Sequence, residues 1–490
     1  MRSTLLLLAG AAVIAAPAAV GAQSAGRPLD QRYVSQAVQQ HPELVQEFGG
    51  AETGPRAAYV NSVGRRVAVQ SGVANAQNAY HFTVLNSAVE NAFAVPGGYV
   101  YITRQLMTLM DNEAELAFVL GHEVGHIAAR HAQARQQATR RNTILGVLGA
   151  ILGSVVGSNI FGELLTRGAM QAAQAATLSF SREQEYQADS LGIRYVVAAG
   201  YNPIGGPGVL AALTRAQALE TRIQGRDSRQ LPEWASTHPL SENRTRMAAA
   251  EAQRTGRLGT GLVNRDQYLA HLEGITVDDS PEQGIIEGRT FTHPDLRIYF
   301  AVPQGYLMQN GTSAVAIQGS GGQARFSGGT YNGPIENYIY TVIQQLAGNT
   351  RVAVPPPRRT VINGIQAAYT TARANTSDGA VDVSVVAYQW DANTIYHLVM
   401  LTQGGSGMGP FLPVVQSVRK ISAAEAAAIR PRIIDVVTVG RGDTIQSLAS
   451  RMAYRNFQVE RFLSLNGLAS NARLSPGQKV KLVVYGTRRT

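Results

Sequence analysis

The spacing of hydrophobic and polar positions divides the chain into three differently patterned regions. Residues from about 28 to 276 follow mostly helical patterns. From about 284 to 420, short alternating runs such as LRIYFAVP and VDVSVVAYQW lie between Gly-rich turns. They predict antiparallel strands, with one helix, IENYIYTVIQQLA, packed on the sheet. A compact segment from about 434 to 486 follows a short helix or linker.

These patterns, in a chain of 490 residues, predict a multidomain α+β protein. We expect a mostly helical domain with a small β-hairpin and edge-strand sheet over residues 23–276. A central antiparallel α+β domain over residues 277–425 and a βααβ module over residues 433–490 complete the predicted architecture.

The N-terminus has the pattern of a secretory signal peptide. One Arg precedes an apolar run, and Val20 and Ala22 form a small-x-small cleavage site, so we predict that residues 1–22 are removed on export. The chain has no cysteine, which excludes disulfides, thiolate ligands and a lipidated N-terminal Cys. We therefore expect a periplasmic protein that is not a lipoprotein.

Residues 142–162 contain no charge and are long enough to cross a membrane. Five glycines and several Ser, Thr and Asn residues weaken both helicity and hydrophobic drive. Three interpretations stay open: a lid or interfacial hairpin in peripheral contact with a membrane, a buried core helix, and a true span.

The strongest candidate chemistry lies in FVLGHEVGHIAARH, residues 118–131. His122 and His126 are four apart, so they share one helix face and can bind the same metal ion. Glu123 is aimed differently and can act as a general base towards a water molecule on that metal. This HExxH spacing is typical of zinc peptidases. His131 lies on another face, and we expect it to be structural or exposed.

A third ligand is required, because zinc in a catalytic site has three protein ligands and an open position. SFSREQEYQADSLGIRYVVAAG predicts a helix from about Arg182 to Ala199, on which Glu185 and Asp189 share a face. We predict Glu185 as the ligand, with Glu183 as its rival. Asp189 is predicted to accept the outer N–H of a ligand histidine.

Together these motifs resemble the HtpX and CAAX prenyl protease family of zinc metallopeptidases, in a soluble, exported form. NEAELAFVLGHEVGHIAARH, ENAFAVPGGYVYITRQLM and STHPLSENR match family motifs, and the resemblance covers about residues 55–250. It implies one zinc ion per chain and cleavage of protein substrates. The several clear transmembrane helices of those enzymes are missing, so prenylated substrates are not implied.

Two further stretches supply candidate site residues. Asn91, Ala92, Phe93 and Ala94 are predicted to form an edge strand that binds an extended peptide by strand addition, the alternative being an ordinary hairpin. In STHPLSENR, His238 and Arg244 are the candidates for oxyanion stabilisation. The family resemblance also implies that the matching histidine can sit on zinc and block the water; a surface histidine in a capping turn is the third possibility.

The last segment resembles a LysM module through VTVGRGDTIQSLA, LNGL and LSPGQKVKL. The resemblance implies binding of peptidoglycan, with a spacer or partner-docking module as the alternative. Net charge is +10, and residues 430–490 hold eleven Lys or Arg against three acidic residues, a charge of +8. In an exported protein this favours an anionic wall or membrane surface over nucleic acid. The middle domain is faintly similar to the PsbP and Mog1 fold and shows no catalytic constellation.

We therefore predict an exported zinc metalloendopeptidase that cleaves unfolded or misassembled cell-envelope proteins. Peptidoglycan, through LysM, and the outer-membrane assembly machinery are its expected partners, and nucleic acid is not. Two alternatives stay open: a cell-wall peptide hydrolase that acts on peptidoglycan, and a latched chaperone or scaffold with little proteolysis.

Overall fold

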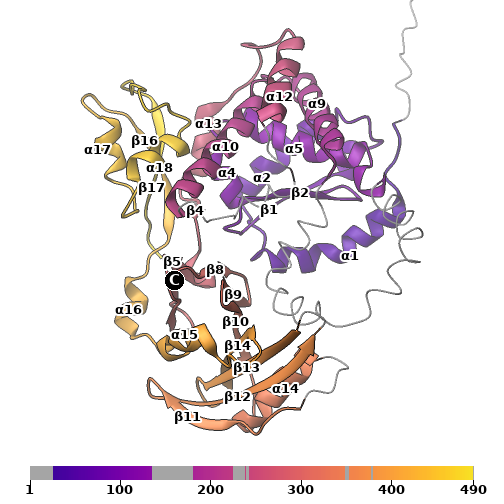
Figure 1. Ribbon diagram of the computed structural model, residues 1–490. Helices are drawn as coiled ribbons and strands as arrows, with labels where there is room; N and C mark the ends of the chain where they lie inside the picture. Colours follow the sequence, from indigo (N-terminus) through magenta and orange to yellow (C-terminus); the bar gives the residue numbers. More distant parts are fainter. Residues whose placement is uncertain are drawn as a thin grey trace, which may run out of the picture.

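The computed structural model describes residues 26–134, 180–224, 238, 242–347, 353–376 and 379–488. The predicted signal peptide and the segment 142–162 lie outside these residues. In the described ranges, no helix combines the length and the apolar character that crossing a membrane requires. The chain has three connected parts, shown from indigo through orange to yellow in Figure 1, and the predicted multidomain α+β class is confirmed.

The N-terminal part is mostly helical. Its elements are α1 (Gln31–Glu47), α2 (Pro55–Ala68), α3 (Ala76–Ala79), β1 (His81–Leu85), β2 (Ala92–Val95), β3 (Tyr99–Thr103), α4 (Arg104–Leu109), α5 (Glu113–Ala128), α9 (Arg182–Ala198), α10 (Gly205–Gln224), α12 (Glu242–Arg254), α13 (Arg265–Leu272) and β4 (Thr276–Val277). Helix α5 lies at the centre and contacts α2, α9 and α10. Its apolar side chains are therefore buried on all sides, as in a helix at the middle of a core.

A three-stranded sheet in the order β1-β3-β2 lies beside α5. Strand β1 is parallel to β3, and β2 is antiparallel to it. The hairpin between β2 and β3 turns at Gly97 and Gly98, which have φ angles of 111° and 96°. A Cβ on Gly98 would lie 1.9 Å from the carbonyl oxygen of Ala79, so only glycine fits there. Strand β2 is left at the edge of the sheet.

The middle part contains two antiparallel sheets, whereas the sequence predicted one. Its elements are β5 (Ile285–Glu287), β6 (Thr290–His293), β7 (Ile298–Ala301), β8 (Leu307–Asn310), β9 (Ala314–Gly319), β10 (Gly322–Thr330), α14 (Ile335–Ala347), β11 (Arg358–Ile362), β12 (Ile365–Thr376), β13 (Gly379–Gln389), β14 (Thr394–Gln403), α15 (Leu412–Ser417), β15 (Arg419–Lys420) and α16 (Ala423–Ala428), with short 3-10 turns at Pro281–Gln283 and Gly409–Phe411. Seven strands form β11-β12-β13-β14-β10-β9-β8, and four form β15-β7-β6-β5. The predicted helix is α14, which packs on β12 and β13.

The last part has the predicted strand, helix, helix, strand order: β16 (Arg432–Thr438), α17 (Ile445–Ala449), α18 (Gln458–Leu465) and β17 (Lys479–Tyr485). It is not a separate module on a linker. Strand β16 pairs with β17 on one side and with β4 of the N-terminal part on the other. One hydrophobic core includes Met107 and Leu213 of the N-terminal part together with Phe462 and Leu482 of the last part. The two parts therefore fold around the same core.

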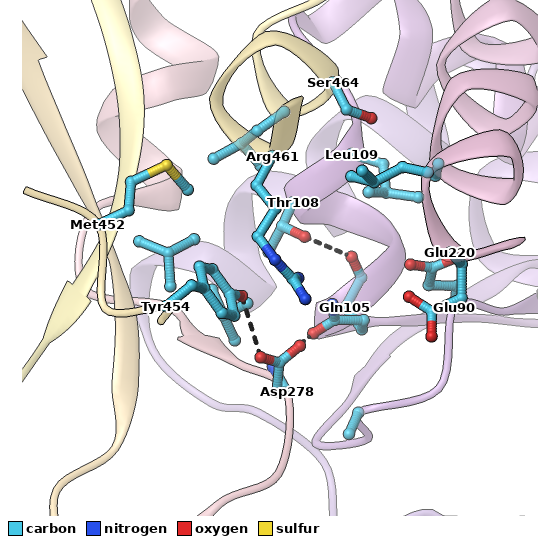
Figure 2. A pocket seen from close by; sticks show the side chains of 16 residues that line it. Glu90, Gln105, Thr108, Leu109, Glu220, Asp278, Met452, Tyr454, Arg461 and Ser464 are labelled. Carbon is cyan, nitrogen blue, oxygen red and sulfur yellow. Dashed lines mark hydrogen bonds between the residues drawn. The ribbon is translucent and has the colours of Figure 1, made fainter. Parts of the chain in front are cut away.

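A cavity of about 290 Å³ remains where these two parts meet. Figure 2 shows Glu90 and Glu220 on one side, Met452 and Tyr454 on the other, and Asp278 at the bottom beside Tyr454. The Tyr454 hydroxyl donates to Asp278 at 3.0 Å, and the Arg461 guanidinium stacks on the Tyr454 ring with 4.0 Å between Cζ and the ring centroid. Polar contacts thus continue the interface beyond the shared core.

Candidate metal centre

Helix α5 begins and ends at well-defined signals. The Asn112 side chain caps its N-terminus by accepting from the amide of Glu115 at 3.1 Å, and two acidic residues lie in the first turn. The helix ends before Arg130, whose φ angle of 58° turns the chain away. The side chains from Glu113 to Ile127 are all buried, so His122, Glu123 and His126 lie inside the protein.

Helix α9 brings the second set of polar residues. It begins with a capping box between Ser181 and Gln184, and it crosses α5 closely because both helices carry glycine at the crossing. A Cβ on Gly192 would lie 3.1 Å from the backbone nitrogen of His122, and one on Gly125 would lie 3.2 Å from the Leu191 side chain. This close approach places Glu185 and Asp189 against the two histidines.

Four buried side chains gather one donor atom each within 4.8 Å of one another: those of His122, His126, Glu185 and His238. His122 Nε2 lies 3.0 Å from His126 Nε2 and 3.3 Å from His238 Nδ1. Glu185 Oε1 lies 3.5 Å from His126 Nε2 and 2.9 Å from His238 Nδ1. These N,N,O,N donors can hold one metal ion.

The spacing of the four donors fits zinc. A tetrahedral zinc ion with ligands at about 2.0–2.2 Å separates neighbouring donor atoms by about 3.3–3.6 Å. Of the four donor separations given above, those of 3.3 and 3.5 Å lie in this range and those of 2.9 and 3.0 Å lie a few tenths of an ångström below it. The rival ligand Glu183 is exposed and is not among the four.

Glu123 lies beside this cluster. It is 1% exposed, and its Oε1 lies 3.5 Å from His238 Nε2. Oε1 has no hydrogen-bond partner among the described residues. A buried carboxylate oxygen without such a partner is suited to accept a proton from a water molecule at the site.

A second layer of contacts holds the cluster. Asp189 Oδ1 lies 2.9 Å from His122 Nδ1 and accepts its N–H, as predicted from the helix spacing. The Arg244 guanidinium donates to both oxygens of Asp189, at 2.7 and 2.8 Å. It also contacts Glu185 Oε2 at 2.9 Å and the carbonyl of His238 at 3.1 Å. Arg244 thus joins α9 to the segment that carries His238.

Burial and charge set the ionisation of these groups. Burial, followed by the neighbouring His122 and His238 rings, holds the pKa of His126 well below its usual range, which keeps the ring neutral. Burial opposes ionisation of Asp189, but Arg244 outweighs it, so the pKa of Asp189 falls far below its usual range. Burial also acts against protonation of His238, yet the carboxylates of Glu185 and Glu123 raise its pKa overall.

Of the four residues predicted to bind substrate, Ala92, Phe93 and Ala94 lie in β2 and Asn91 precedes it. Strand β2 contacts α5 and, among the described strands, pairs with β3 only. Asn91, which precedes β2, is anchored by a pair of hydrogen bonds to the Thr103 side chain. Its own Oδ1 is buried and has no hydrogen-bond partner in the part of the chain that the structure describes. Phe93 stacks on Tyr101, lies tilted against Phe48 and packs against a small separate core.

His131 differs from its predicted place on another helix face. It is 3% exposed, and its Nδ1 lies 2.9 Å from Nδ1 of His126. The turn at Arg130 redirects the chain, so helical spacing gave no signal for this contact. Phe180, which the sequence did not single out, stacks on His126 with ring centroids 3.9 Å apart.

Two histidines of an HExxH helix, a carboxylate from a second helix and the adjacent buried carboxylate of Glu123 define a metallopeptidase class of site. The comparison with known proteins agrees. Residues 55–252 match Peptidase family M48, and residues 437–483 match the LysM domain. The chain therefore carries an M48 peptidase domain and a LysM domain, and both predicted resemblances are confirmed at that level.

Curated relatives match part of the chain. The beta-barrel assembly-enhancing protease of Yersinia pestis is 34% identical over 201 residues, which cover 38% of this chain and 37% of that protein. The protein of the same name from Escherichia coli K12 is 33% identical over 188 residues, with the same coverage. The mitochondrial metalloendopeptidase OMA1 of Arabidopsis thaliana is 29% identical over 171 residues, 35% of this chain and 31% of that protein. This chain thus spans well under half the length of these relatives.

Among solved structures, cyanobacterial PsbP from Synechocystis covers 28% of this chain and 98% of its own, with 9% identity and a TM-score of 0.24. A score this low carries no argument about the fold. The similarity of the middle domain to PsbP and Mog1 therefore stays a prediction.

Proposed function

We propose that this protein is a zinc metalloendopeptidase that cleaves unfolded or misassembled proteins of the cell envelope. The observation that carries the proposal is the buried cluster of His122, His126 and Glu185 beside the free Oε1 of Glu123. A zinc ion held there would supply an activated water as nucleophile and would polarise the scissile carbonyl. Peptidase family M48 supports the same chemistry.

Glu123 carries the proton in this proposal. Its carboxylate accepts a proton from the attacking water at Oε1 and returns it to the nitrogen of the leaving amine. Burial supports this role, because Glu123 is shielded from bulk water that would compete for the proton. Asp189 holds the tautomer of His122, so that the lone pair of His122 lies on Nε2, the atom that faces the other donors of the cluster.

Arg244 was predicted to stabilise the oxyanion, and its contacts favour a different role. Its guanidinium contacts both oxygens of Asp189, an oxygen of Glu185 and the carbonyl of His238. We assign it as a positioning residue that keeps both carboxylates ionised and aligned. The donors it presents to those acceptors are not directed at a substrate.

The substrate is proposed to bind as an extra strand along β2. An edge strand has unpaired main-chain groups that an extended peptide can satisfy, and β2 lies against the helix that carries the metal site. This mode selects unfolded or locally unfolded proteins, because a folded protein does not offer a free strand of sufficient length.

His238 is proposed to close the site at rest. Its Nδ1 lies within tetrahedral spacing of donor atoms of His122 and Glu185, at the vertex that a nucleophilic water needs. Withdrawal of His238, when substrate or a partner binds, would open that position. Oxyanion stabilisation by His238 is the competing role, and its proximity to Glu123 is compatible with it.

The cellular setting follows from the remaining features. The LysM domain supports attachment to peptidoglycan, and the N-terminal pattern of residues 1–22 supports export to the periplasm. The name of the Yersinia and Escherichia relatives, beta-barrel assembly-enhancing protease, supports outer-membrane assembly as the place of action. Wall-peptide hydrolysis is the second candidate, and the LysM domain is the observation that favours it.

One incubation experiment separates these candidates. The purified mature protein is mixed separately with unfolded casein and with peptidoglycan sacculi, and Glu123→Gln serves as the matched control. We expect fragments from casein only, and none from the control. Release of wall peptides would favour the hydrolase, whereas binding without cleavage of either would leave a chaperone or scaffold.

A further inference from the structure

His131 stands outside the proposed ligand set but touches it. Its ring is 3% exposed, with Nδ1 at 2.9 Å from Nδ1 of His126 and Nε2 at 3.0 Å from Oε1 of Gln187. Gln187 lies on α9 two residues after Glu185, so the contact also links the two helices of the site. The three side chains form a chain of hydrogen bonds that ends on a predicted metal ligand.

The direction of these hydrogen bonds follows from Gln187, the last side chain in the series. The amide oxygen of Gln187 can only accept, so Nε2 of His131 carries the proton. In the neutral imidazole Nδ1 then has a lone pair and accepts from Nδ1–H of His126. This leaves the lone pair of His126 on Nε2, the atom that lies 3.0 Å from Nε2 of His122 in the cluster.

The two histidine ligands are therefore held by different partners. His122 donates to the carboxylate of Asp189, whereas His126 donates to a neutral imidazole. We propose, on the basis of the metallopeptidase function proposed above, that His131 is a positioning residue that fixes the tautomer and ring orientation of His126 and so raises the affinity for zinc. Partners of this kind typically change metal affinity by about 10–100-fold.

A packing role is the competing explanation, because His131 also lies near Phe180, with ring centroids 6.0 Å apart. The two explanations predict opposite rankings for the zinc affinity of two variants. Phenylalanine at this position keeps an aromatic ring but has no acceptor. Asparagine loses the ring, yet its Oδ1 takes roughly the place of the imidazole Nδ1 and can accept from His126.

The test measures zinc affinity by competition of the apoprotein with a chromophoric chelator, without any protease assay. We expect His131→Phe to weaken zinc binding by about 10–100-fold and His131→Asn to stay within a few-fold of the parent. His81→Phe is the matched control, since His81 is exposed on β1, and its affinity should equal that of the parent. Equal affinity of His131→Phe and the parent, or equal loss in both His131 variants, would overturn the proposal.

Two further measurements keep the outcome decisive. Circular dichroism of each apoprotein shows whether it folds, and His131→Leu replaces the Phe variant if the latter does not. The casein assay of the parent then tests the proposed function separately. A parent that binds zinc tightly but leaves casein intact would refute the protease and leave the role of His131 standing.

Discussion

Lys481, in the last strand of the LysM domain, donates from Nζ to the carbonyl of Met110 at 2.7 Å. The same ammonium donates to the carbonyl of Thr108 at 2.9 Å and pairs with Asp111 at 3.2 Å. Lys481 is 0% exposed, and burial lowers its pKa. These partners lie at the end of α4 and in the short connection to the Asn112 cap of α5, so a LysM residue holds the entry to the helix that carries His122 and His126.

Lys481→Met tests this connection. Methionine fills a similar volume, but two buried carbonyls and the Asp111 carboxylate lose their donor. Removal of one partner from a buried pair costs about 3–5 kcal/mol, and we expect that loss in urea unfolding. The control is Lys479→Met on the same strand, where an exposed pair with Asp266 contributes roughly 0–1 kcal/mol. Equal stability of the two variants would show that the buried ammonium is dispensable.

Removal of residues 432–490 should do more than abolish the proposed attachment to peptidoglycan. It takes Ile434, Phe462 and Leu482 out of the shared core and leaves β4 without its partner strand. We expect the truncated chain to be largely insoluble or to elute as aggregate in gel filtration. A soluble, monomeric and active truncation would contradict the shared core.

His238→Ala separates the two roles proposed for that residue. If His238 closes the site, the variant keeps its zinc and cleaves casein faster than the parent, because the fourth position is open. If it stabilises the oxyanion, the rate falls by on the order of a hundredfold. Zinc content by atomic absorption and the initial rate of casein cleavage, measured on the same sample, give the answer.

Arg244→Lys should weaken the metal site although the charge is kept. Lysine cannot donate to both oxygens of Asp189 while contacting Glu185, so His122 loses part of its alignment. We expect zinc affinity to fall by about 10–100-fold. Arg246→Lys, on the exposed side of the same helix, is the control and should bind zinc like the parent.

The middle domain should lose stability in acid. Burial, followed by the charge of Arg325, lowers the pKa of His397 to about 3 from its usual 6.5. The unfolded chain therefore binds a proton first as pH falls, and stability decreases between pH 6.5 and 3 by up to roughly 1.4 kcal/mol per pH unit. Calorimetry of the full chain should show a smaller acid shift in His397→Gln, which can keep the contacts to Tyr338 and Ser327.

The sequence predicted the side-chain placements that helical spacing alone determines. His122 and His126 share a helix face because they are four residues apart. The same spacing predicted that Glu185 and Asp189 share a face of a second helix. His131 could not be placed in this way, since the positive φ angle of Arg130 ends the helical spacing before it. The contacts of Arg244 were also hidden, because they depend on how α12 packs against α9.

The LysM domain was separable in the sequence but not in space. Its motif, composition and charge set a boundary near residue 433, and the strand and helix order was correct. Periodicity says nothing of which strand pairs across that boundary, so the β4–β16 pairing had no signal in the sequence. The buried position of Lys481 could not be anticipated either, because a lysine in a basic segment is usually exposed.

The shared sheet and core also decide what such a protein can reach. A LysM module on a flexible linker would let the active site sweep a volume set by the linker length. Here the strand pairing of β16 with β4 makes the joint stiff. If the LysM domain holds a glycan strand, as proposed, this stiff joint would keep the metal site at one height and one angle above the wall. The proposed enzyme would then reach only a thin layer parallel to the peptidoglycan, and a substrate would have to enter that layer to be cut.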